Sequence, residues 1–252
     1  MFFTDSVFVG IDPTSSHKSF TYAALDKSMG LIALADGELD DLTAFLAGQP
    51  SAVVAVNAPS SPNKGVAQKK KKEMFKSLKS RASGFRLAEL QLRERGIAVS
   101  GTPSTVSACP AWVQAGFTLY RKLEKMGFKK FPSDDAQYQV LETQPHACYC
   151  VLIGNVPQPK PSLEGKLQRQ LLLYECGVGI KDPMDFFEEI TRHKMLKGLW
   201  PLDMLYQPEQ LDALIAAYTA WLAFNKPENI SMIGDPAEGM IVLPEKLLKE
   251  KY

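Results

Sequence analysis

The sequence predicts an α/β protein built on a mixed β-sheet, and three observations favour this class. Three short runs rich in β-branched, aromatic and aliphatic residues follow one another closely near the start of the chain. A fully apolar run at 52–56 has the composition of a central parallel strand that is buried on both faces. Segments with apolar residues at helical spacing lie on both sides of this run. Such an alternation of strands and helices is typical of a layered α/β domain.

Each element of the first half has its own signal. The first three strands have short connections, which favours an antiparallel meander. Acidic residues mark the first turn of the helix that follows, and Gly96 stands where the next helix ends. The predicted elements are strands at 7–11, 20–25 and 31–35, a helix at 40–46, a strand at 52–56, a helix from about 76 to 96 and a strand at 97–99.

This order is the layout of the ribonuclease H-like fold, a mixed five-stranded sheet with helices on both faces. The second half is richer in helical patterns, and a hairpin with a turn rich in glycine, proline and acid lies near its end. We expect a single domain over 1–252 with helical insertions and a core at about 5–103, 136–148 and 205–244. The second half contains predicted helices at 111–126, 163–174, 185–196 and 209–224, a strand-like run at 138–141 and hairpin strands at 230–233 and 240–243.

Composition restricts the classes of function. The net charge of +1 predicts that any surface for nucleic acid is a local patch. The four cysteines lack the spacing of a metal knuckle and are expected to be reduced. No stretch approaches the roughly 20 apolar residues that span a bilayer, and the first residues lack the pattern of a secretory signal. We therefore expect a cytoplasmic protein without a membrane partner.

Two polar side chains follow neighbouring apolar strands. Asp12 ends the run 7–11 and precedes Pro13, so a rigid strand would hold its carboxylate at the edge of the sheet. Such a carboxylate is suited to a hard divalent cation, although an Asx-Pro turn is the alternative. Asn57 follows the run 52–56 and is expected to face Asp12. Its carbonyl oxygen can coordinate a metal, but its amide brings no charge.

Two further acids repeat this placement in the second half. Glu142 ends a strand-like run shortly before Pro145, which is suited to the first turn of a helix. Asp212 flanks the apolar stripe of the helix predicted at 209–224, and an aspartate favoured by the helix dipole is the alternative. Three carboxylates at one sheet edge would form a site for Mg²⁺ or Mn²⁺. Two such ions about 4 Å apart can promote phosphodiester cleavage.

Basic residues and histidines supply further candidates. A run of four lysines and two arginines of the following helix could track a nucleic-acid backbone, although a solvated charged face is the alternative. His17 and His146 could each act as a general base, with an ordinary surface histidine as the alternative. The candidate nucleic-acid contacts are Lys69, Lys70, Lys71, Lys72, Arg86 and Arg93.

Five short motifs in order resemble one family. They are Val9-Gly10-Ile11-Asp12, Val56-Asn57-Ala58-Pro59, Val140-Leu141-Glu142-Thr143-Gln144-Pro145-His146-Ala147, Leu211-Asp212-Ala213 and Gly234-Asp235-Pro236-Ala237-Glu238-Gly239. The chain resembles family number 429 among domains of unknown function, described as predicted nucleases with a ribonuclease H-like fold.

The resemblance implies acidic metal ligands at Asp12, Glu142 and Asp212. It also draws attention to Arg86, Glu89, Arg93 and Arg169. The family often has aspartate where this chain has Asn57, and this departure would weaken or remove one metal position.

The function expected from these features is a divalent-metal-dependent nuclease that uses Mg²⁺ or Mn²⁺. A non-catalytic module that binds nucleic acid or protein is one alternative. The segment Gly10-Ile11-Asp12-Pro13-Thr14-Ser15-Ser16 also resembles the first phosphate loop of actin-like ATPases and sugar kinases. Those enzymes need a second glycine-rich loop. The only candidate, 234–239, carries proline and glutamate where small residues are required.

Overall fold

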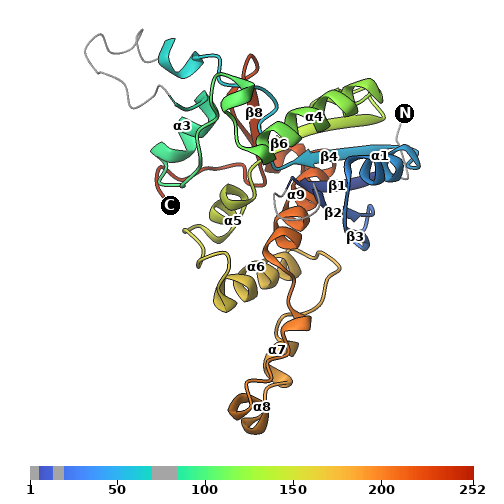
Figure 1. Ribbon diagram of the computed structural model, residues 1–252, viewed down its shortest axis with the longest axis vertical. Helices are drawn as coiled ribbons and strands as arrows, with labels where there is room; N and C mark the ends of the chain where they lie inside the picture. Colours follow the sequence, from blue (N-terminus) through green and yellow to red (C-terminus); the bar gives the residue numbers. More distant parts are fainter. Residues whose placement is uncertain (1–5, 14–19, 70–83) are drawn as a thin grey trace.

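The computed structural model describes residues 6–13, 20–69 and 84–252, and within them the chain forms a mixed α/β fold around an eight-stranded sheet (Figure 1). The strand order is β3-β2-β1-β4-β6-β8-β7, with β5 paired to β6 outside this path. The strands are β1 (Val7–Asp12), β2 (Phe20–Leu25), β3 (Leu31–Gly37), β4 (Ala52–Val56), β5 (Lys129–Lys130), β6 (Tyr138–Thr143), β7 (Ser231–Asp235) and β8 (Gly239–Leu243).

The first three strands form the predicted antiparallel meander. β1 pairs antiparallel with β2, and β2 pairs antiparallel with β3. β4 lies parallel to β1 on one side and parallel to β6 on the other, which confirms its prediction as a central strand. The C-terminal hairpin is also confirmed, because β7 and β8 pair antiparallel. β8 then joins β6 in parallel and extends the sheet beyond the expected five strands.

The predicted strand at 97–99 is wrong. Residues 97–100 have no regular structure, and the place beside β4 is taken by β6. Side chains of α3 (Leu87–Glu94) form hydrogen bonds with the backbone of this segment and of the residues that follow it. Arg93 Nη1 donates to the carbonyl of Val99 over 3.0 Å, and the Thr102 amide donates to Glu89 Oε2 over 2.9 Å. The apolar run therefore packs inward without joining the sheet.

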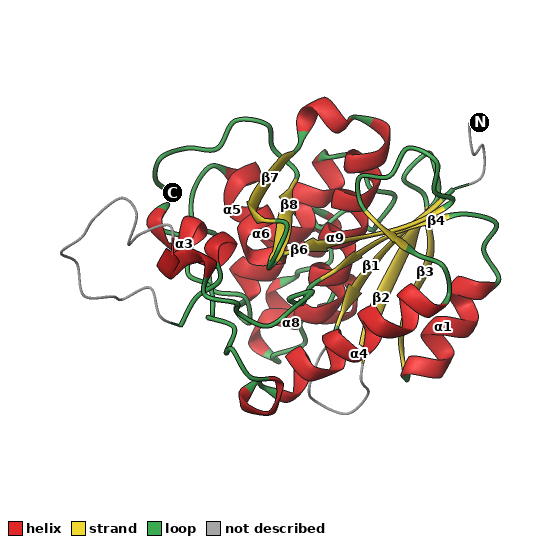
Figure 2. Cartoon of the chain, turned by 90° about the horizontal axis from the view of Figure 1, so that it is seen from above, coloured by secondary structure: helices red, strands yellow, loops and turns green. Residues whose placement is uncertain are grey.

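Helices cover both faces of the sheet (Figure 2). α9 crosses one face against β1, β2 and β4, whereas α1 and α4 lie over the other face. The alternation of side chains along β1 explains this layering, since Val9 and Ile11 pack toward α1 and α4 while Phe8 belongs to the core on the α9 side. The helices on the two faces and at the site are α1 (Leu39–Ala47), α4 (Ala111–Lys125), α5 (Pro145–Ile153), α6 (Leu163–Glu175) and α9 (Pro208–Asn225).

Glycine at position 10 lets α9 approach β1 closely. A Cβ atom on Gly10 would lie 1.9 Å from the Ala213 carbonyl oxygen and 2.3 Å from the Ala217 amide nitrogen. The small side chains along this part of α9 complete the close contact. The same contact brings the first half of α9 alongside the C-terminal end of β1.

Two predicted helices differ from the structure. The helix expected at 185–196 is divided into α7 (Asp185–Glu188) and α8 (Arg192–Leu196). Thr191 has extended backbone angles, and its side chain accepts a hydrogen bond from the Lys194 amide, so it begins a new helix instead of continuing the first. Of the helix expected from 76 to 96, α3 is described, whereas 70–83 lie outside the described residues. Within the described part, every helix is too short or too polar to cross a lipid bilayer.

Candidate functional site

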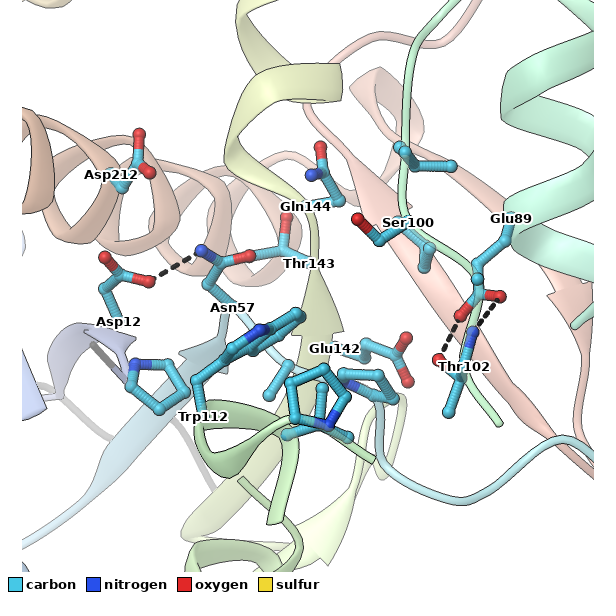
Figure 3. A pocket seen from close by; sticks show the side chains of 18 of the residues that line it. Asp12, Asn57, Glu89, Ser100, Thr102, Trp112, Glu142, Thr143, Gln144 and Asp212 are labelled. Carbon is cyan, nitrogen blue, oxygen red and sulfur yellow. Dashed lines mark hydrogen bonds between the residues drawn. The ribbon is translucent and has the colours of Figure 1, made fainter. Parts of the chain in front are cut away.

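The candidate site is a cavity of about 380 Å³ at the carboxyl ends of the parallel strands β1, β4 and β6. Asp12 ends β1, Asn57 follows β4, and Glu142 lies at the end of β6. Asp212 enters from α9, and Lys160 enters from the connection between α5 and α6. This end of a parallel sheet is a common place for ligands in α/β proteins. Figure 3 shows Asp12, Asn57 and Asp212 at one side of the cavity and Glu142, Glu89 and Thr102 at the other.

Asp12 is a buried carboxylate with few partners. Within the described residues, it accepts one side-chain hydrogen bond, from Asn57 Nδ2 over 2.6 Å. Burial, with the negative charge of Asp212 as the next cause, raises the pKa of Asp12 to about 7. Lys160 and the hydrogen bond from Asn57 only partly offset this effect. The carboxylate of Asp12 is therefore held in a place that favours an additional positive charge.

Asp212 lies next to Asp12 and has a lysine partner. Its side chain is buried, and Lys160 Nζ lies 2.5 Å from its Oδ2. Burial raises the pKa of Asp212, and the attraction of Lys160 opposes this shift without cancelling it. Burial alone would lower the pKa of Lys160, but the neighbouring Asp212 raises it above its usual value. The charge of Arg169 adds a weaker attraction to Asp212, while Glu209 adds a negative charge near both aspartates. Carboxylates therefore outnumber cations in this half of the site.

The connection that carries Lys160 is fixed by side chains of α6. Buried Arg169 donates through Nη1 to the Gln158 carbonyl over 2.8 Å and to the Gly165 carbonyl over 2.9 Å. A Cβ atom on Gly165 would lie 2.0 Å from the Pro159 carbonyl oxygen, so this position requires glycine. Arg169 therefore holds the backbone that presents Lys160 and does not itself line the cavity.

Glu142 lies in a different electrostatic environment. Both of its carboxylate oxygens accept from the guanidinium of Arg86: Nη1 donates to Oε2 over 3.0 Å, and Nη2 bonds Oε1. The Ser60 amide also donates to Oε2 over 2.8 Å. Burial disfavours the charge of Arg86, but Glu142 and then Glu89 outweigh it and raise the pKa of Arg86 above its usual range. Both oxygens of Glu142 are therefore hydrogen-bonded within the protein.

Two more buried acids complete this network. Glu89 accepts from Arg86 Nε over 2.7 Å, from the Arg86 amide and from Thr102. Glu238 accepts three backbone amide hydrogen bonds, from Lys64 over 2.8 Å, Val66 over 2.9 Å and Leu87 over 3.0 Å. The Arg86 network, defined as Arg86, Glu89, Glu142 and Glu238, thus joins the loop after β4, α3, β6 and the β7–β8 turn.

The structure corrects two roles predicted from the sequence. Arg86 was expected to contact nucleic acid, but it is buried and its guanidinium is fully used by the Arg86 network. Glu142 was expected beside Asp12 and Asp212 as a metal ligand, but it pairs with Arg86 instead. The physical reason is that α3 packs against β7 and β8, which places Arg86 at its N-terminus beside Glu142. Sequence spacing gave no indication of that packing.

Among the remaining candidates that the structure describes, Arg93, His146 and Lys69 do not line the cavity. Arg93 bonds the Val99 carbonyl and lies over the Phe85 ring, 4.7 Å from its centroid. His146 lies in the first turn of α5, where burial, followed by Arg169, lowers its pKa and favours the neutral ring. Its Nε2 lies 3.8 Å from Cys150 Sγ. Lys69 is exposed, whereas Lys70, Lys71, Lys72 and His17 lie outside the described residues.

Sequence reasoning missed Lys160, Glu209 and Glu238 as parts of this region. Lys160 lies in the proline-rich segment Pro157-Gln158-Pro159-Lys160-Pro161. A lone cation between prolines was a usable signal, because prolines reduce the freedom of the segment that carries it. Glu209 also lines the cavity and adds negative charge near Asp12 and Asp212.

In the described residues, no group of three or more His, Cys, Asp or Glu side chains is close enough to hold a metal. The donors that lie together are the carboxylates of Asp12 and Asp212 and the amide of Asn57. Asn57 uses its N–H on Asp12, which leaves its carbonyl oxygen as an acceptor. Magnesium is commonly held by one or two carboxylates plus water and substrate phosphate. This donor set fits one hard cation, and it does not fit the pair of cations expected from three acids.

The chain belongs to the family described as "Protein of unknown function (DUF429)", whose model matches residues 10–238. The match includes the ends of β1, β4 and β6 as well as α9, and so every residue of the cavity discussed above. Searches among curated proteins and among solved structures gave no match.

Proposed function

We propose that this protein is a divalent-metal-dependent phosphodiester hydrolase, a nuclease, with a fold of the ribonuclease H-like type. The observation that carries the proposal is the adjacent pair of buried carboxylates, Asp12 and Asp212, with only one ammonium beside them. Buried charges are costly unless they are paired or coordinate a metal. A site that stores uncompensated negative charge at the carboxyl end of a parallel sheet is suited to a hard cation and a phosphate ester.

The topology supports the fold assignment. The meander of three antiparallel strands, the helix and the parallel strand β4 match the expected layout, and β6 takes the place beside β4 that was expected for 97–99. The additional strands β7 and β8 extend this core at the edge beyond β6. The assignment rests on this arrangement, and the function is argued from the site.

In the proposed reaction Asp12 and Asp212 would hold a single Mg²⁺ or Mn²⁺, with the carbonyl oxygen of Asn57 as a further donor. Such an ion lowers the pKa of a bound water and polarises the phosphoryl oxygen. Asn57 fixes the orientation of Asp12 through its amide hydrogen bond. Lys160 is partly exposed at the mouth of the site and can donate to a phosphate oxygen of the substrate. The Arg86 network holds the opposite wall and takes no part in the reaction.

Cleavage assays would test the proposal. The purified protein is incubated with labelled single- and double-stranded DNA and RNA in Mg²⁺, in Mn²⁺ and in EDTA. We expect cleavage that requires the metal and falls at least about 100-fold in Asp12→Asn and in Asp212→Asn, as for the loss of a group that stabilises charge in the transition state. Asp40→Asn is the matched control, because Asp40 is almost fully exposed and far from the cavity along the chain. Metal-independent cleavage, or equal rates in all three variants, would contradict the proposal.

One observation favours a second candidate, a non-catalytic binding module. Lys160 already pairs with Asp212, and the raised pKa of Asp12, about 7, lets Asp12 take up a proton near neutral pH, so the site could be neutral without a metal. This candidate predicts binding to nucleic acid that weakens steeply with salt and no turnover in any metal. By contrast, nothing favours a kinase-type site, because the turn at 234–239 is packed against the loop after β4. A Cβ on Gly239 would lie 2.3 Å from Ser60 Oγ, and Glu238 binds the Lys64 and Val66 amides.

A further inference from the structure

A segment between α6 and α9 extends away from the sheet and is here called the arm, residues 182–205. It contains α7, α8 and the short 3₁₀ helix Leu202–Met204. Figure 1 shows α7 and α8 at the far end of the longest axis, well separated from the strands. The arm is remote from the metal site proposed above, and the argument about it does not depend on that site.

The arm exposes most of the large apolar side chains found on the surface. Within the described residues, twelve large hydrophobic side chains are exposed, and seven of them belong to the arm. Leu196 is 86% exposed and Leu199 is 59% exposed. A soluble monomer seldom concentrates apolar surface in this way, whereas an interaction surface does. The seven side chains are Met184, Phe187, Met195, Leu196, Leu199, Trp200 and Leu202.

The arm has a defined shape of its own. Phe186 is buried and stacks on Trp200, with ring centroids 6.4 Å apart and ring planes inclined by 5°. Phe187 packs edge-on against Phe186 at 5.5 Å. Lys194 pairs with Glu189 across the break between α7 and α8 over 2.7 Å. The exposed apolar side chains are thus presented on a folded scaffold, which reduces the entropy lost when a partner binds.

The charges of the arm restrict the kind of partner. Its five acidic side chains outnumber its three lysines and arginines, which does not favour nucleic acid or an anionic membrane. The two signs are separated along the chain: most acids lie at and before α7, and the bases lie on α8. The acids are Asp182, Asp185, Glu188, Glu189 and Asp203, and the bases are Arg192, Lys194 and Lys197.

We propose that the arm is a homodimer interface and that its occupant is the arm of a second copy of this chain. In a two-fold dimer the same patch meets itself, so each residue pair occurs twice. An antiparallel pairing places the acidic α7 of one copy against the basic α8 of the other, and the apolar side chains meet between them. The arm has 24 residues, and an interface of standard size uses about 20–30 residues on each side.

The first test is sedimentation velocity of the full chain over about 1–100 µM, because interfaces of this size have affinities from micromolar to picomolar. We expect a dimer, and we expect Leu196→Asp to raise its dissociation constant at least about 30-fold, the effect of a central apolar contact. Leu247→Asp is the control, because Leu247 is 79% exposed outside the arm. Both variants should retain the wild-type far-UV circular dichroism, since neither side chain is buried, whereas at high concentration only Leu196→Asp should lose the part of the melting temperature that dimerisation adds.

The second test uses charge reversal to examine the pairing itself. Asp185→Lys with Glu188→Lys makes α7 basic, and Arg192→Glu with Lys197→Glu makes α8 acidic. Each double variant alone should be monomeric, because like charges then face each other at both ends of the interface. An equimolar mixture should form a heterodimer, since opposite charges are restored at both ends.

Three results would overturn the proposal: a wild-type monomer throughout the concentration range, a dimer that Leu196→Asp leaves unchanged, or double variants that fail to pair on mixing. A wild-type monomer whose arm instead captures another protein would assign the surface to a different partner and reject the homodimer.

Discussion

The two halves of the cavity contain the same kind of group, buried carboxylates, but they satisfy them very differently. Around Arg86, the carboxylates of Glu89, Glu142 and Glu238 accept hydrogen bonds from a guanidinium, a hydroxyl or backbone amides. On the opposite side Asp12 has one amide donor and Asp212 has one ammonium. Burial is similar in the two halves, and each half has one cation for two or more carboxylates, so the halves differ in the supply of hydrogen-bond donors.

This difference separates a structural role from a chemical one. A carboxylate whose oxygens are all bonded within the protein ties elements together and has little capacity left for a ligand. Burial raises the pKa of a carboxylate that has few hydrogen-bond donors, and binding a cation from solution stabilises the charged form of such a group most. Residue type and burial do not show which acids of this site have a structural role and which have a chemical one. Their hydrogen-bond and charge partners do.

The largest expected effect is on the Arg86 side. Arg86→Met would leave the carboxylates of Glu89 and Glu142 buried without their cation, so we expect the free energy of unfolding to fall by about 3–5 kcal/mol. Urea denaturation would measure this loss. Arg93→Met is the control on the same helix, because Arg93 donates to the Val99 carbonyl and lies over the Phe85 ring, and a much smaller loss is expected. Equal losses in the two variants would show that the network does not hold this wall.

Asp12→Asn should increase the free energy of unfolding, in contrast to Arg86→Met. The folded pKa of Asp12, about 7, lies above the value of about 3.9 in an unfolded chain, so its contribution to stability is present below about pH 4 and is lost as pH rises to about 7. Without metal, the variant should be more stable than the wild type at pH 8 by on the order of a few kcal/mol, and similar to it near pH 4.

Urea denaturation in EDTA at several pH values would measure this difference, and Glu238→Gln is the control from the other half. Glu238 accepts three backbone amides, so its neutral replacement should destabilise the protein at pH 8. Loss of stability in Asp12→Asn at pH 8 would mean that Asp12 is satisfied in the same way as Glu238.

Gly10→Ala would test how closely α9 must approach β1. The new methyl group would overlap backbone atoms of α9, so the helix must move, at a cost of about 1–3 kcal/mol. Because Asp212 moves with α9, metal-dependent cleavage should fall as well. Gly48→Ala is the matched control, since the nearest atom to its Cβ would lie at an ordinary 3.5 Å. Thermal unfolding of both variants would measure the cost, and a fully tolerated Gly10→Ala would contradict the contact.

Lys160→Met is expected to reduce stability less than Arg86→Met, because the lysine side chain is partly exposed, although the buried Asp212 loses its partner. Its removal frees Asp212, so Mn²⁺ should bind more tightly to the variant than to the wild type in calorimetric titrations. Weaker Mn²⁺ binding would indicate that Lys160 supports the cation site instead of competing for it. Lys166→Met, a half-buried lysine of α6 that bonds the Gln207 side chain and no carboxylate, provides the comparison.

Much of the fold could be predicted from the sequence because its signals are local. The antiparallel meander, the central strand 52–56, the helix that became α9 and the C-terminal hairpin all follow from periodicity and turn residues. The prediction of a strand at 97–99 was wrong because a three-residue apolar run does not show whether the segment pairs with a strand or packs against a helix. The helix predicted at 185–196 is divided because Thr191 is the N-cap of a second helix, although the apolar spacing continues across it.

The site could be predicted only in part, for a related reason. Asp12, Asn57 and Glu142 were placed correctly at strand ends, since the carboxyl ends of parallel strands share one edge. Which acids are neutralised depends on Arg86 and Lys160, which come from distant segments of the chain. Their pairing is a tertiary property, and no spacing along the sequence encodes it.

The most direct test of the account is anomalous diffraction from crystals soaked in Mn²⁺. The account predicts one strong peak within coordinating distance of Asp12 and Asp212, with Arg86 still bound to Glu142. A peak at Glu142 with Arg86 displaced, or no peak near Asp12 and Asp212 at saturating Mn²⁺, would contradict it.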